Sequence, residues 1–114
     1  AAAPQAPAST PAPTAQGLDY ASLKQTLAQL ETDIAAFETQ AAAVQSVSEA
    51  YTALSSYRQL DDRIDRLDDQ IERASKTGVI TWEQARELDA EEEQLDSRID
   101  RIEDQLERRF GIDD

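Results

Sequence analysis

The sequence predicts an all-α protein: an antiparallel, coiled-coil-like helical hairpin preceded by one further helix. Three observations predict this fold. Apolar residues recur at alternating spacings of three and four along three segments, a fifteen-residue pattern occurs twice, and a glycine-containing turn separates its two copies. Two arrangements satisfy the pattern, a three-helix bundle and an elongated dimer.

Residues 1–17 differ in composition from the rest of the chain. They contain all four prolines and no charged side chain, and they are otherwise rich in Ala, Ser and Thr. Because proline cannot donate a backbone hydrogen bond, we expect a disordered head or tether here. The same composition is typical of a chain from which a signal peptide was removed. We therefore expect a periplasmic or secreted location, with a cytoplasmic one as the alternative.

The folded domain is expected over residues 18–114, and its first helix over about 19–44. Asp19 is suited to the N-cap, and Leu18 is placed to pack onto Leu23 as a hydrophobic staple. An apolar stripe follows at helical spacing. Its members are Tyr20, Leu23, Leu27, Leu30, Ile34, Phe37, Ala41 and Val44.

A second helix is expected over about 47–77. Ser46 and Glu49 match a capping box that would open it, although one continuous helix with a local irregularity is an open alternative. The apolar stripe loses phase here, because Val47, Tyr51 and Leu54 lead to Tyr57 with two successive three-residue steps. The stripe of the second helix then comprises Tyr57, Leu60, Ile64, Leu67, Ile71 and Ala74.

A third helix is expected over about 81–110. Gly78 is suited to the left-handed residue after the second helix, and Thr81 with Gln84 forms a capping box for the third. Ile80 can pack onto the first residue of the stripe that follows. That stripe comprises Ala85, Leu88, Leu95, Ile99, Ile102, Leu106 and Phe110. Because so few residues connect the two helices, they must fold back on each other.

Two segments of the hairpin are near copies. Gln59–Arg73 reads QLDDRIDRLDDQIER and Gln94–Arg108 reads QLDSRIDRIEDQLER, so they differ at four of fifteen positions. A fainter copy, QLETDIAAFETQ, occupies Gln29–Gln40 in the first helix. The simplest explanation is one helical unit used three times.

The repeat places acidic residues at one edge of the hairpin. With Leu60 at heptad position d, Asp61 and Asp68 fall at position e of the second helix, and Asp89 and Asp96 at position e of the third. Folding the chain back at the turn sets e beside e. We therefore expect Asp61 close to Asp96 and Asp68 close to Asp89.

This row of carboxylates is the candidate site. Carboxylate oxygens are the ligands that hard cations prefer, so the row predicts a site for Ca²⁺ or a lanthanide ion. The candidate ligands are Asp61, Asp65, Asp68, Asp89, Asp96 and Asp100. A basic partner would relieve the same charge, and so would solvent together with local ion pairs along each helix. Such pairs are Asp62–Arg66, Asp69–Arg73 and Asp104–Arg108.

A homodimer is a further alternative. In a parallel pair of chains, Arg63 would meet Asp68 of the second chain, and Arg98 would meet Glu103. Each exposed pair contributes only about 0.3 to 0.5 kcal/mol. Charge alone therefore does not override the hairpin, which can still dimerise through another face.

Composition excludes several classes of function. The net charge is −13, from 24 acidic and 11 basic residues, which disfavours nucleic acids and anionic lipids as partners. The sequence has no apolar run long enough to enter a bilayer as a span. It also contains no His and no Cys, the commonest catalytic base and thiol nucleophile. We expect a protein that is not an enzyme and needs no cofactor beyond the cation considered above.

The turn resembles two known families. Ile80-Thr81-Trp82-Glu83-Gln84 resembles the LTxxQ motif of the periplasmic helical family that includes the Spy-like and CpxP-like chaperones. That resemblance implies a periplasmic helical hairpin, often dimeric, that binds unfolded polypeptide or senses envelope stress. Lys76–Leu88, KTGVITWEQAREL, is similar to the SHOCT short helical hairpin.

Together these features predict a non-catalytic, extracytoplasmic helical binding protein. It would engage a protein partner or a basic peptide through helix surfaces, in a chaperone-like or envelope-associated role. Two alternatives stay open: hard-cation binding through the acidic row, and an acidic mimic that blocks a basic site of another protein.

Overall fold

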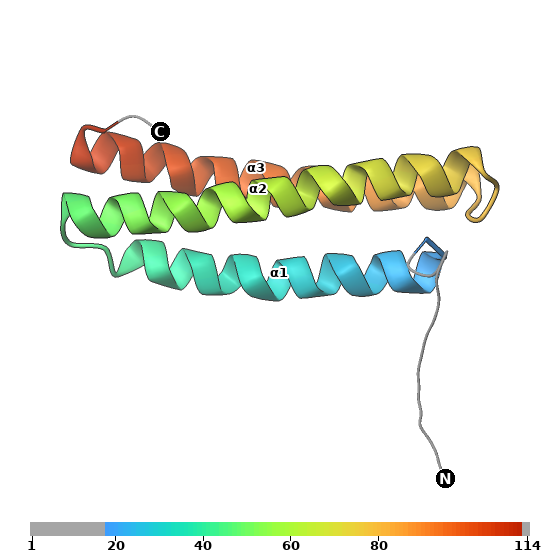
Figure 1. Cartoon of the computed structure of the whole chain (residues 1–114), viewed down its shortest axis with the longest axis horizontal. Helices are drawn as coiled ribbons and strands as arrows, with labels where there is room; N and C mark the ends of the chain where they lie inside the picture. Colours follow the sequence, from blue (N-terminus) through green and yellow to red (C-terminus); the bar gives the residue numbers. More distant parts are fainter. Residues whose placement is uncertain (1–17, 113–114) are drawn as a thin grey trace, which may run out of the picture.

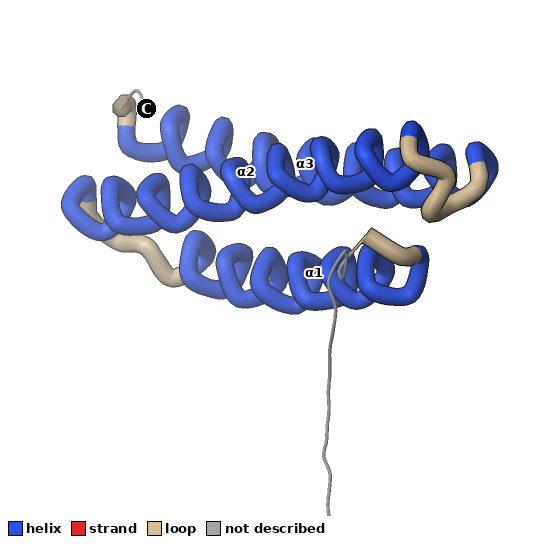
Figure 2. The backbone as a smooth tube through the Cα atoms, turned by 45° about the vertical axis from the view of Figure 1, so that its right-hand side comes forward, coloured by secondary structure: helices blue, strands red, loops and turns tan. Residues whose placement is uncertain are grey.

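The protein is a bundle of three long helices. The computed structural model describes residues 18–112, which form α1 (Tyr20–Ala42), α2 (Val47–Lys76) and α3 (Trp82–Phe110). The helices run in alternating directions, and each of the three packs against the other two (Figure 1, Figure 2). The all-α fold and the hairpin preceded by a helix are confirmed. The head expected over 1–17 lies outside the described residues.

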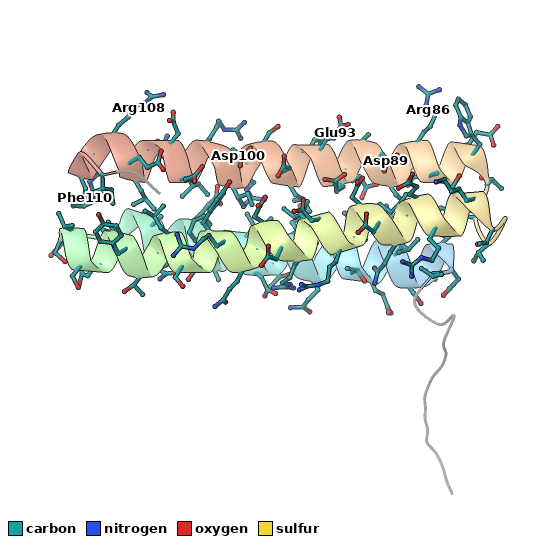
Figure 3. All side chains as sticks on the ribbon, turned by 45° about the horizontal axis from the view of Figure 1, so that its top comes forward. Arg86, Asp89, Glu93, Asp100, Arg108 and Phe110 are labelled. Atoms are coloured by element: carbon teal, nitrogen blue, oxygen red, sulfur yellow. The ribbon has the colours of Figure 1, made fainter. Side chains whose placement is uncertain are left out.

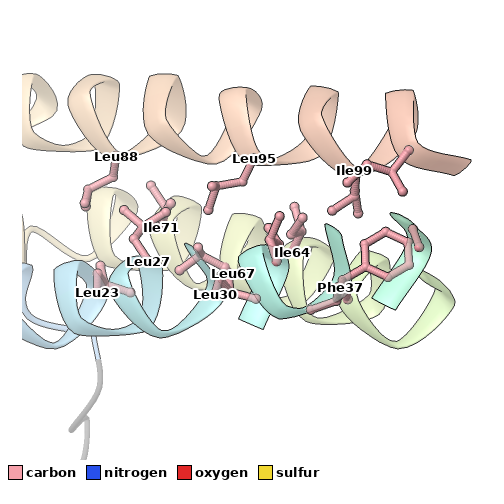
Figure 4. Packing of buried hydrophobic residues seen from close by; sticks show 14 of the residues in the cluster. Leu23, Leu27, Leu30, Phe37, Ile64, Leu67, Ile71, Leu88, Leu95 and Ile99 are labelled. Carbon is pink, nitrogen blue, oxygen red and sulfur yellow. The ribbon is translucent and has the colours of Figure 1, made fainter. Parts of the chain in front are cut away.

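The core is almost entirely aliphatic. Side chains from all three helices point toward one another along the length of the bundle (Figure 4). Phe37, which is 2% exposed, is the one aromatic residue among the buried side chains described. Burying each leucine or isoleucine stabilises the fold by about 2 kcal/mol. The largest fully buried side chains are Leu23, Leu30, Ile34, Leu54, Ile64, Leu67, Ile71, Leu88 and Ile99.

The first helix begins as the sequence indicates, apart from its cap. Asp19 occupies the N-cap position of α1, and Leu18 packs against the core. The Asp19 side chain makes no capping hydrogen bond to the backbone of the first turn. A hydrogen bond from the Ser22 side chain lowers the pKa of Asp19 instead.

Helix α1 ends at Ala42 and α2 begins at Val47, so these are two separate helices. Ser46 caps α2: its hydroxyl accepts a hydrogen bond from the Glu49 backbone N–H at 3.1 Å. The Glu49 carboxylate accepts one from the backbone N–H of Gln45 at 2.8 Å. These bonds satisfy N–H groups that a helix start leaves without partners. Of the two alternatives for this region, the capped second helix is the observed one.

The first two turns of α2 bury the same heptad positions, a and d, as the rest of the helix. Val47 and Tyr51 are 46% and 50% exposed, whereas Ala50 and Ala53 are fully buried. The loss of phase expected in this region coincides with the end of α1, and Val47 and Tyr51 lie outside the core. The turn before Ser46 resets the rotation of the helix, so the phase of the α1 stripe does not carry over into α2.

Gly78 terminates α2 with a left-handed residue, φ +77°. The Val79 N–H donates to the Ala74 carbonyl at 2.9 Å, and the Gly78 N–H donates to the Ser75 carbonyl at 3.2 Å. This pair of hydrogen bonds is the Schellman arrangement, which satisfies carbonyls at a helix end. Ile80 follows and is 4% exposed, so the turn is fixed to the core immediately after the glycine.

Thr81 starts α3 with the predicted capping box. Its hydroxyl accepts from the Gln84 backbone N–H at 3.0 Å, and the Gln84 side chain accepts from the Thr81 N–H at 2.9 Å. Ile80 and Ala85 are both buried, as expected for the staple. Each of the four turn residues singled out in the sequence therefore has a structural role.

Replacing Gly78 with alanine tests the turn. A Cβ at this position meets no atom within 4 Å, so the cost comes from the left-handed backbone alone. We expect Gly78→Ala to lower the free energy of unfolding by about 1 kcal/mol. Gly78→Asn should cost less, because asparagine tolerates this conformation. Urea denaturation measures both, and equal losses would contradict the backbone explanation.

Candidate functional site

Carboxylates face each other across one side of the hairpin, as the heptad register predicts. Asp61 lies close enough to raise the pKa of Asp96, and Asp68 close enough to raise that of Asp89, in addition to the effect of burial. We call this surface the acidic edge. It comprises Asp61, Asp65, Asp68, Glu72, Asp89, Glu92, Glu93, Asp96 and Asp100.

Acids follow one another along the side of α3 that faces the acidic edge. Figure 3 shows Asp89, Glu93 and Asp100 at intervals along the helix, with Arg86 toward its start and Arg108 toward its end. The central part of the acidic edge therefore carries charge of one sign over several helical turns.

The six predicted ligands do not form one site. Asp68 and Asp89 belong to a cluster with Glu92, in which one carboxylate oxygen of each residue lies within 4.8 Å of the others. Asp61 and Asp65 belong to a second cluster of the same kind with Asp62, all on α2.

The last two predicted ligands, Asp96 and Asp100, lie between α2 and α3 farther along the edge. Asp96 is half-buried, and its pKa is raised by burial first and then by Asp100, Asp61 and Asp65. Asp100 accepts a hydrogen bond from the Tyr57 hydroxyl at 2.7 Å. Burial and this carboxylate raise the pKa of Tyr57.

Glu92 belongs to the candidate site but is not among the ligands predicted from the sequence. It is 9% exposed, the one buried charged side chain among residues 18–112. It lies at position a of α3, between the buried Leu88 and Leu95. The sequence does indicate this position. Leu88 and Leu95, successive members of the apolar stripe, are seven residues apart, so position a between them lacks an apolar residue.

Burial dominates the electrostatics of Glu92. Loss of hydration raises its pKa to about 7, and the nearby carboxylates of Asp68, Asp96 and Asp89 add to the effect. Both causes disfavour the charged form of the acid. A neutral Glu92 is therefore well populated near neutral pH, although ordinary glutamates are ionised there.

The opposite edge of the hairpin is neutralised by α1. Arg63 pairs with Asp33 at 2.8 Å. Arg98 makes two hydrogen bonds to Glu38, from Nε at 3.2 Å and from Nη2 at 2.6 Å. These two arginines are the ones that the parallel dimer would require, and both are used within the chain.

Two further contacts fix α1 against α3. Lys24 lies 3.3 Å from Glu87 and 2.8 Å from Glu91. Arg109 donates to the Val44 carbonyl at 2.7 Å, where α1 has just ended. Of the local pairs expected along the helices, Asp104–Arg108 is present. The pairs that hold α1 thus leave the acidic edge as the open side of the hairpin.

A shallow groove follows the junction of α1 and α3. Its volume is about 220 Å³, and it is lined by Lys24, Leu27, Ala28, Glu31, Glu91, Gln94 and Leu95. Because Lys24 already pairs with Glu91 there and apolar residues alternate with charged ones in the lining, the groove has neither a concentrated charge nor a continuous apolar surface. It offers less to a ligand than the acidic edge does.

Among the described residues, no helix combines the length and the apolar composition that a membrane span requires. Comparisons with protein-family models, curated proteins and solved structures find no match. The resemblances to the LTxxQ and SHOCT families therefore stay predictions. The capping box accounts for Thr81 and Gln84 without reference to either family.

Replacing Glu92 with glutamine tests the buried acid. Because the pKa of Glu92 is raised in the folded protein, its protonated form stabilises the fold, and this contribution is fully present below the ordinary glutamate pKa. The contribution is lost as pH rises through about 7. The wild-type protein should therefore melt at a lower temperature near pH 8 than near pH 5.5. Glu92→Gln should remove most of that difference and stabilise the fold near pH 8 by about 2 kcal/mol.

Glu83→Gln provides the control, since it makes the same change at an exposed position on the same helix. Its melting temperature should follow the wild-type pH profile between these two values. Parallel profiles for wild type and Glu92→Gln would show that Glu92 is ionised at an ordinary pKa and is not buried.

A double-mutant cycle tests the contact between α1 and α3. We expect Glu38→Gln and Arg98→Gln to show a coupling energy of about 0.5 to 1 kcal/mol that falls as salt is added. The exposed Lys76–Glu72 pair, 3.1 Å apart on α2, is the matched control and should couple more weakly. Equal coupling energies would mean that the Glu38–Arg98 pair does not help to hold α1 in place.

Proposed function

We propose that this protein is a non-catalytic binding protein whose acidic edge holds a basic segment of a partner polypeptide. The observation that carries the proposal is the contrast between the two edges of the hairpin. Acids of α1 neutralise Arg63 and Arg98 on one edge, while on the other edge burial and then neighbouring carboxylates raise the pKa values of Asp89 and Asp96.

The geometry of the acidic edge suits an elongated ligand. From Asp61 to Glu72, α2 rises by about 16 Å, and it presents acids at spacings of three and four residues over that length. A basic helix carrying Lys or Arg at the same spacing could place a cation beside each step. Long-range attraction would also speed the encounter, and this effect is sensitive to salt.

The non-catalytic part of the proposal is supported by residue chemistry. The sequence has no His or Cys, and carboxylate pairs that cleave glycosides act in a cleft that holds the sugar. Glu92 has the raised pKa of a general acid, but it lies beneath Asp68 and Asp89 on a narrow rod. It does not line the groove between α1 and α3.

The surface favours the binding of a basic segment through charge over chaperone-like binding through exposed apolar residues. The exposed large apolar residues fall into two pairs, Val47 with Tyr51 at the start of α2 and Val79 with Trp82 at the hairpin turn. These positions are at opposite ends of the bundle (Figure 1). The periplasmic or secreted location stays part of the proposal, on the composition of residues 1–17, and cell fractionation tests it.

A peptide titration tests the proposed function. We expect a peptide rich in Lys and Arg to bind, and a peptide of equal length with glutamine at those positions not to bind, in fluorescence anisotropy. Affinity should fall steeply with added salt. The triple variant Asp61→Asn, Asp65→Asn, Asp96→Asn should bind at least about tenfold more weakly, because it removes charge from the centre of the edge.

A second triple variant distinguishes binding at the acidic edge from attraction by the net charge of the whole protein. Glu31→Gln, Asp69→Asn and Glu83→Gln remove the same charge from exposed positions outside the acidic edge. This variant should keep nearly the wild-type affinity. An equal loss in both triple variants would mean that net charge alone attracts the peptide, and it would contradict the proposed site.

A further inference from the structure

Glu92 interrupts an otherwise apolar seam. The neighbouring seam positions of α3 are Leu88 and Leu95, and both are buried. The Glu92 side chain is more than nine-tenths buried. Among residues 18–112, no Lys or Arg pairs with it, and its one hydrogen-bonding partner is Asp68, another acid. Burying an ionised carboxylate without a positive partner destabilises a protein, and protonation or a bound cation relieves that cost.

The carboxylate of Glu92 is directed at two others. One oxygen each from Asp68 of α2 and from Asp89 and Glu92 of α3 lie within 4.8 Å of one another. Calcium–oxygen bonds are about 2.4 Å long, so two ligand atoms of one ion lie at most about 5 Å apart. The three oxygens therefore lie close enough together to bind the same ion.

The surroundings of the three acids suit a hard cation. Glu92 is buried, Asp89 is half-buried and Asp68 is exposed, so the cluster opens on its outer side to water. Water is needed there, because Ca²⁺ takes six to eight oxygen ligands. The chain has no His or Cys, the ligands that favour zinc and copper.

We propose that Asp68, Asp89 and Glu92 form a site for one hard cation, Ca²⁺ or a trivalent lanthanide, that bridges α2 and α3. The ion neutralises three carboxylates that repel one another across the two helices, and so stabilises the hairpin. A trivalent ion balances all three negative charges and binds more tightly than Ca²⁺. The three acids lie within the acidic edge, but the cation site does not depend on the proposed binding of a peptide there.

The second acidic cluster carries no such proposal. Asp61, Asp62 and Asp65 all come from α2, and Asp62 and Asp65 are exposed. The cluster has no buried carboxylate that a cation would relieve. Its acids serve as an internal comparison for the cation site.

Calorimetric titration of the full chain with calcium chloride, and separately with terbium chloride, tests the proposal near pH 8, where carboxylates are ionised. We expect one ion per chain, a higher melting temperature with either ion, and affinity for terbium at least about tenfold above that for calcium. Affinity should fall as pH drops through about 7, because protons compete for Glu92.

Two variants decide where the ion binds. Glu92→Gln removes the buried ligand while keeping its shape, and should weaken terbium binding by about tenfold or more. Asp69→Asn removes the same charge from the exposed position next to Asp68, and should change affinity by less than about twofold. Equal losses in the two variants would show a diffuse cloud of counterions, and an unchanged melting temperature with either ion would also overturn the proposal.

Discussion

The tight turn at Gly78 is the constraint on which the rest of the structure depends. It forces α2 and α3 into antiparallel contact, and the two helices carry the same heptad pattern 35 residues apart, which is a whole number of heptads. Like positions therefore face each other on both edges. Acids at position e produce the acidic edge, and arginines at position g produce the edge that α1 covers through Asp33 and Glu38.

The acids of α2 and α3 repel one another across the acidic edge. The fold tolerates this repulsion because the apolar seam stabilises the bundle along its whole length. Exposed like charges each cost little in water, where Coulomb interactions are weak. Glu92 differs, because it is withdrawn from water into the seam and faces Asp68 and Asp89. Protonation is therefore favoured more at Glu92 than at an ordinary exposed glutamate.

Much of this structure could be predicted from local sequence signals. Each predicted helix boundary lies within two residues of the observed one, since Ser46, Thr81 and Gly78 act through hydrogen bonds to nearby residues. The pairing of Asp68 with Asp89 followed from periodicity alone. Features that depend on docking could not be predicted in this way. The burial of Glu92 depends on packing that overrides the polarity of a single side chain.

The most direct test is a pH titration of the side-chain carboxyl carbons by NMR. The seam packing predicts that the Glu92 signal titrates with a midpoint near pH 7, well above the ordinary glutamate value of 4.5. It also predicts that the pKa values of Asp89 and Asp96 lie above the ordinary aspartate value. A Glu92 midpoint near its ordinary value would place that side chain in water. It would contradict the register that brings the acids of α2 and α3 together.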